Sequence, residues 1–244
     1  MENIEKDTFE TSQGDLEIGF VGHGTLLMSF GGKIIHIDPF SNVADYSEMP
    51  KADIVFITHD HFDHLDPEAL KHIVTKDTVI VCSQLCADKV GNEIVMENGD
   101  VKDIQGIKTE AVPMYNIKHK QESGNPFHIK GEGNGYILTL GDKRVYIAGD
   151  TENVPEMKEI KDIDIAFLPM NLPYTMSPEM AADAASTNNS TVFYTNFGSD
   201  DLSGISGYRI KTNGGTWVSA NNITLSADGS YGVLSYVIDY AGNV

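Results

Sequence analysis

The chain has 244 residues, of which 17 are basic and 36 acidic, so its formal net charge is −19. This length is enough to bury a sizeable hydrophobic core, in one medium domain or two small ones. The acidic balance argues against nucleic acid as a partner, because phosphate backbones are bound by clustered lysines and arginines.

Short apolar or β-branched runs predict the strands in the first three quarters of the chain. Helical patterns follow possible capping residues at Asp66, Ser83 and Ser177. Strands occur in adjacent pairs as well as in βα units, so we predict an α/β fold in which sheets pack on each other with helices outside. The expected strands are 16–21, 25–30, 33–38, 53–58, 78–82, 135–140, 144–149 and 163–170, and the expected helices are 67–74, 84–90 and 178–186.

Two cysteines, Cys82 and Cys86, are too few to stabilise a fold of this size through disulfides. We expect buried thiols, with a redox or metal-binding role as the alternative. The first residues contain no apolar run after a basic start, and no window approaches the roughly 18 apolar residues of a membrane span. We therefore expect a cytoplasmic protein that makes no contact with a membrane.

The composition changes near residue 187. All eight histidines and all nine methionines precede this position, whereas the last 58 residues contain 29 Ser, Thr, Asn or Gly and no Glu. Apolar runs separated by turn signals predict an all-β segment here. We therefore expect one domain at 1–186 and a β-rich segment at 187–244, with strands at 190–197, 207–212, 222–227 and 231–240.

The stretch THDHFDHLD, residues 58–66, directly follows a predicted buried strand. A loop at the end of a strand is held by a rigid sheet and can fix several ligands. His59 and His61 can point the same way toward one cation, while Asp63 and His64 can turn toward a neighbouring one. This mixture of nitrogen and oxygen ligands favours zinc over magnesium or calcium. The alternative for a single loop histidine is solvent exposure or a hydrogen bond to the backbone.

Asp150 follows the predicted strand 144–149. A carboxylate at the end of a second strand can bridge two cations, so we expect Asp150 to complete the site. The alternative is that Asp150 caps the segment that follows it.

Three motifs together resemble the metallo-β-lactamase-fold hydrolases: H-x-H-x-D-H at 59–64, GDT at 149–151 and IDP at 37–39. The stretches VPMYN, FHIKGEGNGYILT, YIAGDTENVPEM and LPMNLPYTMSPEMAADAA are similar to one branch, that of ascorbate-6-phosphate lactonases and their relatives. The resemblance covers residues 15–186 or so. It implies an αββα sandwich with one or two metal ions at one edge.

The resemblance also implies a ligand set. The first ion would be held by His59, His61 and a third histidine. His128 is favoured as the third, because FHIKG precedes a strand as in this branch, and His119 is the alternative. The second ion would be held by the residues that remain: Asp63, His64 and the bridging Asp150.

Two further residues are expected near the site. Asp38 is expected to orient a ligand through hydrogen bonds. His23 lies in an early strand turn and is expected either behind a ligand or facing substrate, with an ordinary loop histidine as the alternative.

The chain departs from this family after its last predicted helix. The family usually takes its last ligand for the second ion from a histidine on a following strand, and this chain has no histidine after His128. From about Thr187 the sequence instead resembles a fragment of a bacterial immunoglobulin-like repeat, which includes SGISGYRIKTNGGTW. We therefore expect a core that is incomplete at its C-terminal end, joined to an Ig-like segment in a natural fusion, a recombination product or an engineered chimera.

These features predict a zinc-dependent hydrolase with one or two ions, for which manganese and iron are alternatives. A metal-bound hydroxide would attack a small ester, lactone or phosphoester, with Asp63 steering the nucleophile and either Asp63 or a metal-bound water protonating the leaving group. The rival hypotheses are a non-catalytic chimeric protein with an incomplete site and a metal-dependent phosphodiesterase. The expected partner is a small-molecule substrate.

Overall fold

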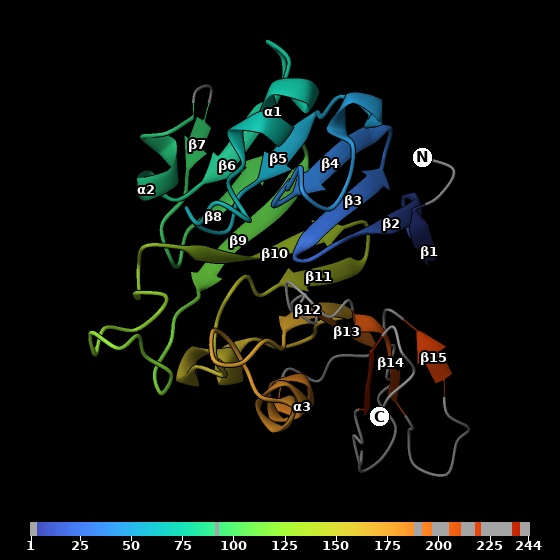
Figure 1. Ribbon diagram of the computed structural model, residues 1–244. Coiled ribbons are helices and arrows are strands. Elements are labelled where there is room, and N and C mark those ends of the chain that lie inside the picture. The colour runs from blue at the N-terminus through green and yellow to red at the C-terminus, as the bar shows by residue number, and fades with distance from the viewer. Residues whose placement is uncertain are drawn as a thin grey trace.

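A computed structural model describes residues 4–90 and 93–187 and four later strands at 192–196, 205–210, 218–220 and 236–239. Two β-sheets pack face to face, and helices cover their outer sides (Figure 1). This is the sandwich that the alternation of strand pairs and βα units predicts. Within the described residues no helix is both long and apolar enough to cross a membrane.

The first sheet has seven strands in sequence order. The first four strands pair antiparallel, and from β4 to β7 the pairing is parallel. Apolar side chains of two helices pack on its outer face against strands β5 and β6. The strands are β1 (Glu5–Thr11), β2 (Gly14–Gly22), β3 (Thr25–Phe30), β4 (Lys33–Ile37), β5 (Ile54–Phe56), β6 (Val79–Cys82) and β7 (Glu93–Val95), and the helices are η1 (Tyr46–Glu48), α1 (Pro67–Ile73) and α2 (Gln84–Ala87).

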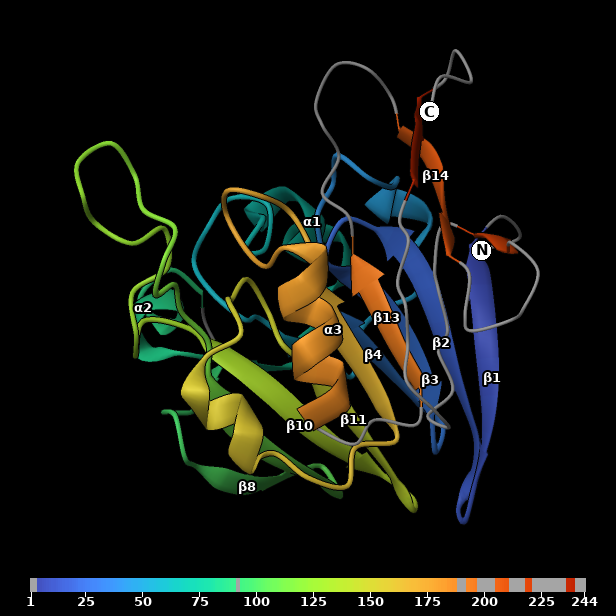
Figure 2. The ribbon, with the colours of Figure 1, turned by 90° about the horizontal axis from the view of Figure 1, so that it is seen from below.

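The second sheet has six strands in the order β13-β12-β11-β10-β9-β8. Helix α3 crosses its outer face (Figure 2), where alanines and methionines pack against the sheet. The strands are β8 (Val101–Ile104), β9 (Ile107–Pro113), β10 (Asn134–Leu140), β11 (Lys143–Ile147), β12 (Ile165–Pro169) and β13 (Val192–Asn196), and the helices are η2 (Pro155–Glu159) and α3 (Pro178–Thr187).

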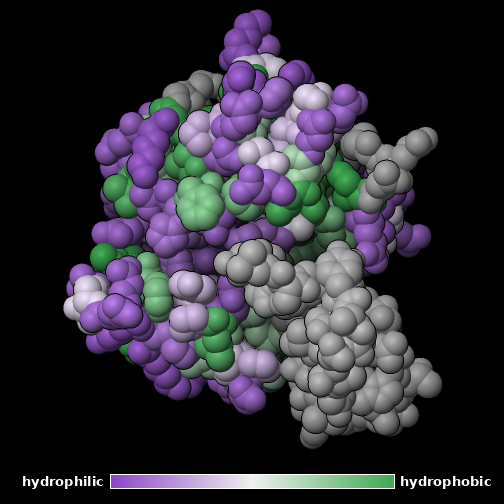
Figure 3. Space-filling view, in the orientation of Figure 1, coloured by the Kyte–Doolittle hydropathy of each residue, from purple (hydrophilic) through white to green (hydrophobic). Residues whose placement is uncertain are grey.

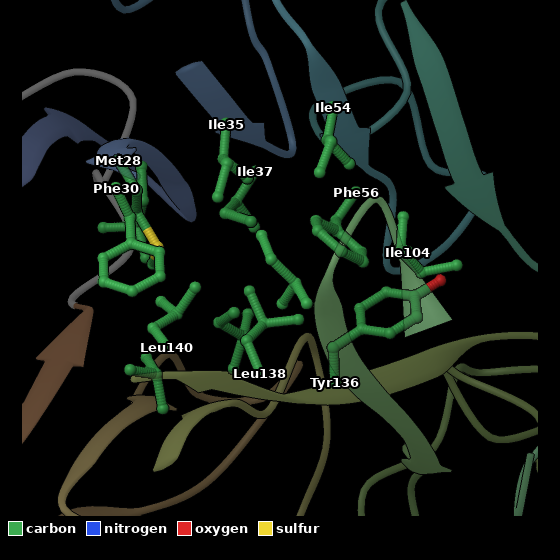
Figure 4. Packing of buried hydrophobic residues seen from close by; sticks show 14 of the residues in the cluster. Met28, Phe30, Ile35, Ile37, Ile54, Phe56, Ile104, Tyr136, Leu138 and Leu140 are labelled. Atoms are coloured by element: carbon green, nitrogen blue, oxygen red, sulfur yellow. The ribbon is translucent and has the colours of Figure 1, made fainter. Parts of the chain in front are cut away.

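Apolar side chains from both sheets fill the space between them. Ile35, Ile37 and Phe56 project from the first sheet toward Tyr136 and Leu138 of the second (Figure 4), and all five are buried. Full burial of such a side chain contributes about 1.5–3 kcal/mol, so this layer fixes how the two sheets lie on each other. The loops at one edge of the sandwich are thereby held in place.

The capping residues of the helices agree with the sequence at two of three positions. Asp66 caps α1 by accepting a hydrogen bond from the amide of Glu68, and Ser177 Oγ accepts one from the amide of Met180. Ser83 does precede α2, but its side chain makes no capping bond. Its hydroxyl donates instead to the carbonyl of Glu132, a residue distant in sequence, and not to a capping interaction with the first turn of α2.

The C-terminal quarter contains two kinds of strand. Strand β13 pairs in parallel with β12, so the second sheet continues past residue 186. Three further strands, β14 (Ile205–Ile210), β15 (Val218–Ala220) and β16 (Tyr236–Asp239), form a separate antiparallel sheet. The strand expected at 222–227 lies outside the described residues, and the Ig-like nature of the segment stays a prediction.

Candidate metal centre

The candidate ligands lie in loops at one edge of the sandwich. The loop 57–66 follows β5, and Asp38 follows the neighbouring strand β4, to which β5 is parallel. From the second sheet, His128 comes before β10 and Asp150 comes after β11. Strands that are distant in sequence therefore bring the histidine loop and the GDT turn together.

His59, His61 and His128 form one cluster, in which the potential ligand atoms lie within 4.8 Å of one another. The ring of His128 is 4.9 Å from that of His59 and 4.8 Å from that of His61, between centroids. His119 is not part of this cluster, because its Nδ1 lies 2.6 Å from the buried carboxylate of Glu152. Of the two histidines left open by the sequence, the structure brings His128 to the site.

Asp150 lies between the histidines of two clusters. Its Oδ1 is 3.6 Å from Nε2 of His64, and its Oδ2 is 3.6 Å from Nε2 of His128. These distances exceed a hydrogen bond, and they are close to the roughly 3.3 Å that separates two ligands of one tetrahedral zinc ion. Each carboxylate oxygen thus faces a different histidine, as a bridging carboxylate requires.

A second cluster consists of His23, Asp63 and His64, with ligand atoms again within 4.8 Å of one another. His23 Nε2 lies 3.1 Å from Asp63 Oδ2. The structure therefore places Asp63 and His64 together, as the H-x-H-x-D-H spacing predicts, and adds His23 to them.

Three imidazoles offer a free nitrogen to the site. The Nε2 atoms of His59, His64 and His128 are buried, and none has a hydrogen-bond partner among the described residues. Buried polar atoms are nearly always paired, so these three nitrogens fit a cation that they would coordinate. The donor set of imidazoles and carboxylates is the one that zinc and related divalent metals take.

The other nitrogen of each of these imidazoles is anchored. Nδ1 of His59 lies 3.0 Å from Thr58 Oγ1, and Nδ1 of His64 lies 2.8 Å from Asp38 Oδ2. Nδ1 of His128 lies 2.7 Å from Asn116 Oδ1. Since Asp38 and Asn116 accept through oxygen, Nδ1 of His64 and Nδ1 of His128 each carry a proton, and Nε2 is the nitrogen that faces the site.

Asp38 makes several of the hydrogen bonds that anchor these imidazoles and their loop. Its carboxylate accepts hydrogen bonds from the backbone amide of Thr58 at 2.7 Å, from the hydroxyl of Thr58 at 2.6 Å and from His64. The single proton of the Thr58 hydroxyl goes to Asp38, which leaves its oxygen to accept from Nδ1 of His59. The structure thus places Asp38 where the sequence expects it, behind the ligands.

Asn116 is a part of the site that the sequence did not single out. Its Oδ1 accepts from both the backbone amide and Nδ1 of His128, at 2.8 and 2.7 Å, and its own amide donates to the carbonyl of Tyr174. The stretch VPMYN contains this residue, but nothing in the spacing indicates that its side chain reaches residue 128.

Gly149 of the GDT turn also has a steric role. Its φ is +64°, and a Cβ atom there would lie 2.8 Å from Met114 Sδ and 3.0 Å from Thr58 Cβ. Only glycine combines this backbone conformation with so close an approach. The glycine therefore lets the turn that carries Asp150 approach the histidine loop.

Burial and neighbouring charges shift the pKa values of the candidate ligands. Burial lowers the pKa of His59 well below its usual value and that of His128 to about 4, so both rings are neutral at neutral pH. Burial acts the same way on His64, but the carboxylates of Asp150 and Asp38 outweigh it and raise the pKa of His64 well above its usual value. Burial would raise the pKa of Asp150, and the charge of His64 lowers it below its usual range. A cation binding between the two would displace a proton from His64.

Comparisons with known proteins agree with this geometry. The family model described as Beta-lactamase superfamily domain matches residues 17–194. A UPF0173 metal-dependent hydrolase of Ligilactobacillus salivarius is 33% identical over 190 residues, which cover 70% of this chain and 80% of that protein. A second one, of Lysinibacillus sphaericus, is 30% identical over 182 residues, with the same coverage of 70% and 80%.

Solved structures give the same result. A protein of Parabacteroides distasonis, provisionally described as a metal-dependent hydrolase, is 44% identical and superposes with a TM-score of 0.76 over 82% of this chain and 90% of that one. Igni18, a metallo hydrolase of Ignicoccus hospitalis, is 23% identical with a TM-score of 0.59 over 74% and 81% of the two chains, and it shares the fold.

Proposed function

Because this chain belongs to the UPF0173 metal-dependent hydrolases of the metallo-β-lactamase superfamily, we propose that it uses zinc to hydrolyse a small ester or lactone. The observation that supports this most directly is the set of three buried Nε2 atoms without a hydrogen-bond partner among the described residues, around a carboxylate with one oxygen toward each cluster. A phosphoester is the second substrate class.

The residues divide the work as follows. His59, His61 and His128 would hold one ion, and Asp63, His64 and Asp150 a second. A zinc ion at such a site lowers the pKa of bound water to about 7, so that a nucleophile is available at neutral pH. Asp63, which is partly exposed, would orient that nucleophile and return a proton to the leaving group.

An exposed aromatic ring beside the ligands favours a substrate with an apolar part. Phe62 lies between His61 and Asp63 in the chain, is 74% exposed, and contacts Phe40 edge to face. Most of the face in Figure 3 is hydrophilic with apolar residues interspersed. The net charge of −19 disfavours a polyanion, so an uncharged ester with an aryl or alkyl group fits best.

Replacement of Phe62 by alanine tests this substrate preference. We expect KM for an aryl ester to rise about fivefold with little change in kcat, because an aromatic contact of about 1 kcal/mol is lost from the bound substrate and from the transition state alike. The control is Val101→Ala, at an exposed residue of β8. Steady-state kinetics on aryl and methyl esters measure it, and an equal KM change for both esters would contradict the preference.

Metal content and thermal stability test the metal dependence itself. We expect about two ions per chain after purification without added metal, by elemental analysis. A chelator should lower Tm by roughly 5–10 °C, since a ligand at a hundred times its Kd adds about 2.7 kcal/mol. Absence of bound metal, together with a melt that a chelator leaves unchanged, would favour the non-catalytic alternative. A panel of lactones, esters and phosphodiesters then separates the substrate classes.

A further inference from the structure

His23 differs from the histidines around it in which nitrogen carries the proton. The backbone amide of Gly24 donates a hydrogen bond of 2.7 Å to Nδ1 of His23. A neutral imidazole has one donor and one acceptor nitrogen, so Nε2 of His23 bears the proton. His64 and His128 show the opposite arrangement, because their Nδ1 atoms face the acceptor oxygens of Asp38 and Asn116.

The protonated nitrogen of His23 faces Asp63. Nε2 lies 3.1 Å from Asp63 Oδ2, a distance within the range of an N–H···O hydrogen bond to a carboxylate. The ring is fixed from two further sides, since it contacts Phe40 and His64 edge to face at 5.8 and 5.1 Å between centroids. These contacts leave the ring little freedom to present another nitrogen.

The backbone of His23 also adopts an unusual conformation. His23 has φ +52°, a conformation that few residues other than glycine, asparagine, aspartate and histidine adopt. Such strain persists only where the surroundings determine it. The turn between β2 and β3 is therefore built to hold this ring against Asp63.

We infer that His23 is a positioning residue that donates a hydrogen bond to Asp63 and is not a metal ligand, an inference that rests on the proposed metal site. The cluster of His23, Asp63 and His64 would otherwise make His23 a substitute for the histidine that is absent after residue 128. Coordination through Nε2 requires its proton to leave while Nδ1 still accepts from Gly24, which a neutral ring cannot satisfy. His23 thus leaves Asp63 Oδ1 as the oxygen that faces a cation.

Imidazole nitrogen shifts test the assignment without any substrate. In the zinc-loaded protein, long-range ¹⁵N–¹H NMR spectra should show His23 protonated on Nε2, and His64 and His128 protonated on Nδ1. The His23→Asn variant assigns the His23 signals. A His23 ring that is protonated on Nδ1 in the zinc-loaded protein, with Nε2 shifted by the metal, would overturn the inference.

A pair of variants measures what the hydrogen bond contributes. In a zinc titration, the weaker of the two zinc sites of His23→Leu should bind zinc 10 to 100-fold less tightly than in the wild type. Loss of an outer hydrogen bond to a ligand usually has an effect of this size. His23→Gln keeps an N–H donor and, like leucine, is not among the residues that readily adopt this positive φ, so it should recover most of this affinity without a difference in backbone strain. Equal losses in the two variants would make His23 a ligand, and no loss in either would make its contact with Asp63 incidental.

Failure of this inference is distinct from failure of the proposed function. Zinc binding and ring protonation are measured on the wild-type and variant chains in the absence of substrate. A wild-type chain that takes up zinc, shows the expected ring states and hydrolyses no member of the substrate panel would refute the proposed substrates and support the role of His23.

Discussion

Substitution of Asp150 by asparagine is expected to reduce hydrolysis by more than 100-fold and to lower the number of bound ions from two to one or none. Loss of an outer partner of a ligand alone reduces affinity or activity by roughly 10 to 100-fold, and Asp150 faces both clusters. Asparagine keeps the shape of the side chain, but it replaces one oxygen by an NH₂ group. That group points its protons at an Nε2 lone pair, where a cation would otherwise lie.

The metal-free Asp150→Asn chain should nevertheless fold. Its new amide can pair with Nε2 of His64 or His128, so the substitution adds no buried group without a partner. Elemental analysis, steady-state kinetics and a melt in chelator together measure the outcome. Asp77→Asn, at an exposed carboxylate paired with Lys76, is the matched control. Two bound ions and activity within tenfold of the wild type would contradict the bridging role.

Much of the architecture could be predicted, because its strands have local signals. Runs such as TLLMSF and GYILTL appear as β3 and β10, and Asp66 with Pro67 marks the start of α1. The strands that were missed are β1 and β9, whose residues alternate with charged side chains, and β7, β8 and β15, which are only three or four residues long. Such short strands depend on their neighbours in the sheet more than on their own sequence.

Two buried thiols also behave as the composition indicates. Cys82 and Cys86 are free and buried among apolar residues of α1 and β5. Burial raises the pKa of Cys82 to about 12 and that of Cys86 to about 11, so both are poor nucleophiles and poor ligands. The redox and metal-binding alternatives therefore receive no support from the structure.

The candidate site was predictable where ligands are close in sequence. The spacing of His59, His61, Asp63 and His64 after a strand indicates a shared cation, and the structure places them in adjoining clusters. The choice between His128 and His119 depended on tertiary contacts: Glu152 holds His119, and Asn116 holds His128. Asn116 and His128 are 12 positions apart in the chain, and His119 and Glu152 are 33 apart, so no local pattern encodes these contacts.

The protonation of His23 is a further property that only the structure gives. It follows from one backbone amide, that of Gly24, which donates to Nδ1 of His23. A sequence pattern shows that a histidine is present, but the choice between ligand and donor depends on which nitrogen is already occupied.

Asp38→Asn is expected to reduce metal affinity by 10 to 100-fold while the chain remains folded. Asp38 is buried and accepts three hydrogen bonds from Thr58 and His64. An asparagine can still accept from the amide of Thr58 with its oxygen, but its NH₂ group then faces Nδ1 of His64. To avoid two opposed donors, His64 must move its proton to Nε2, where it blocks the lone pair that faces Asp150.

Asp38→Ala is expected to be more severe, because all three donors lose their partner. Removal of one partner from a buried charge pair such as Asp38 and His64 costs about 3–5 kcal/mol, so we expect a loss of roughly this size in the free energy of unfolding. Urea denaturation of the chelated proteins measures this loss separately from metal binding. The control is Asp53→Asn, because Asp53 accepts from the amide of Ile34 at the opposite end of β5. If Asp38→Asn bound zinc as tightly as Asp53→Asn, the hydrogen bond from His64 to Asp38 would not decide which nitrogen of His64 carries the proton.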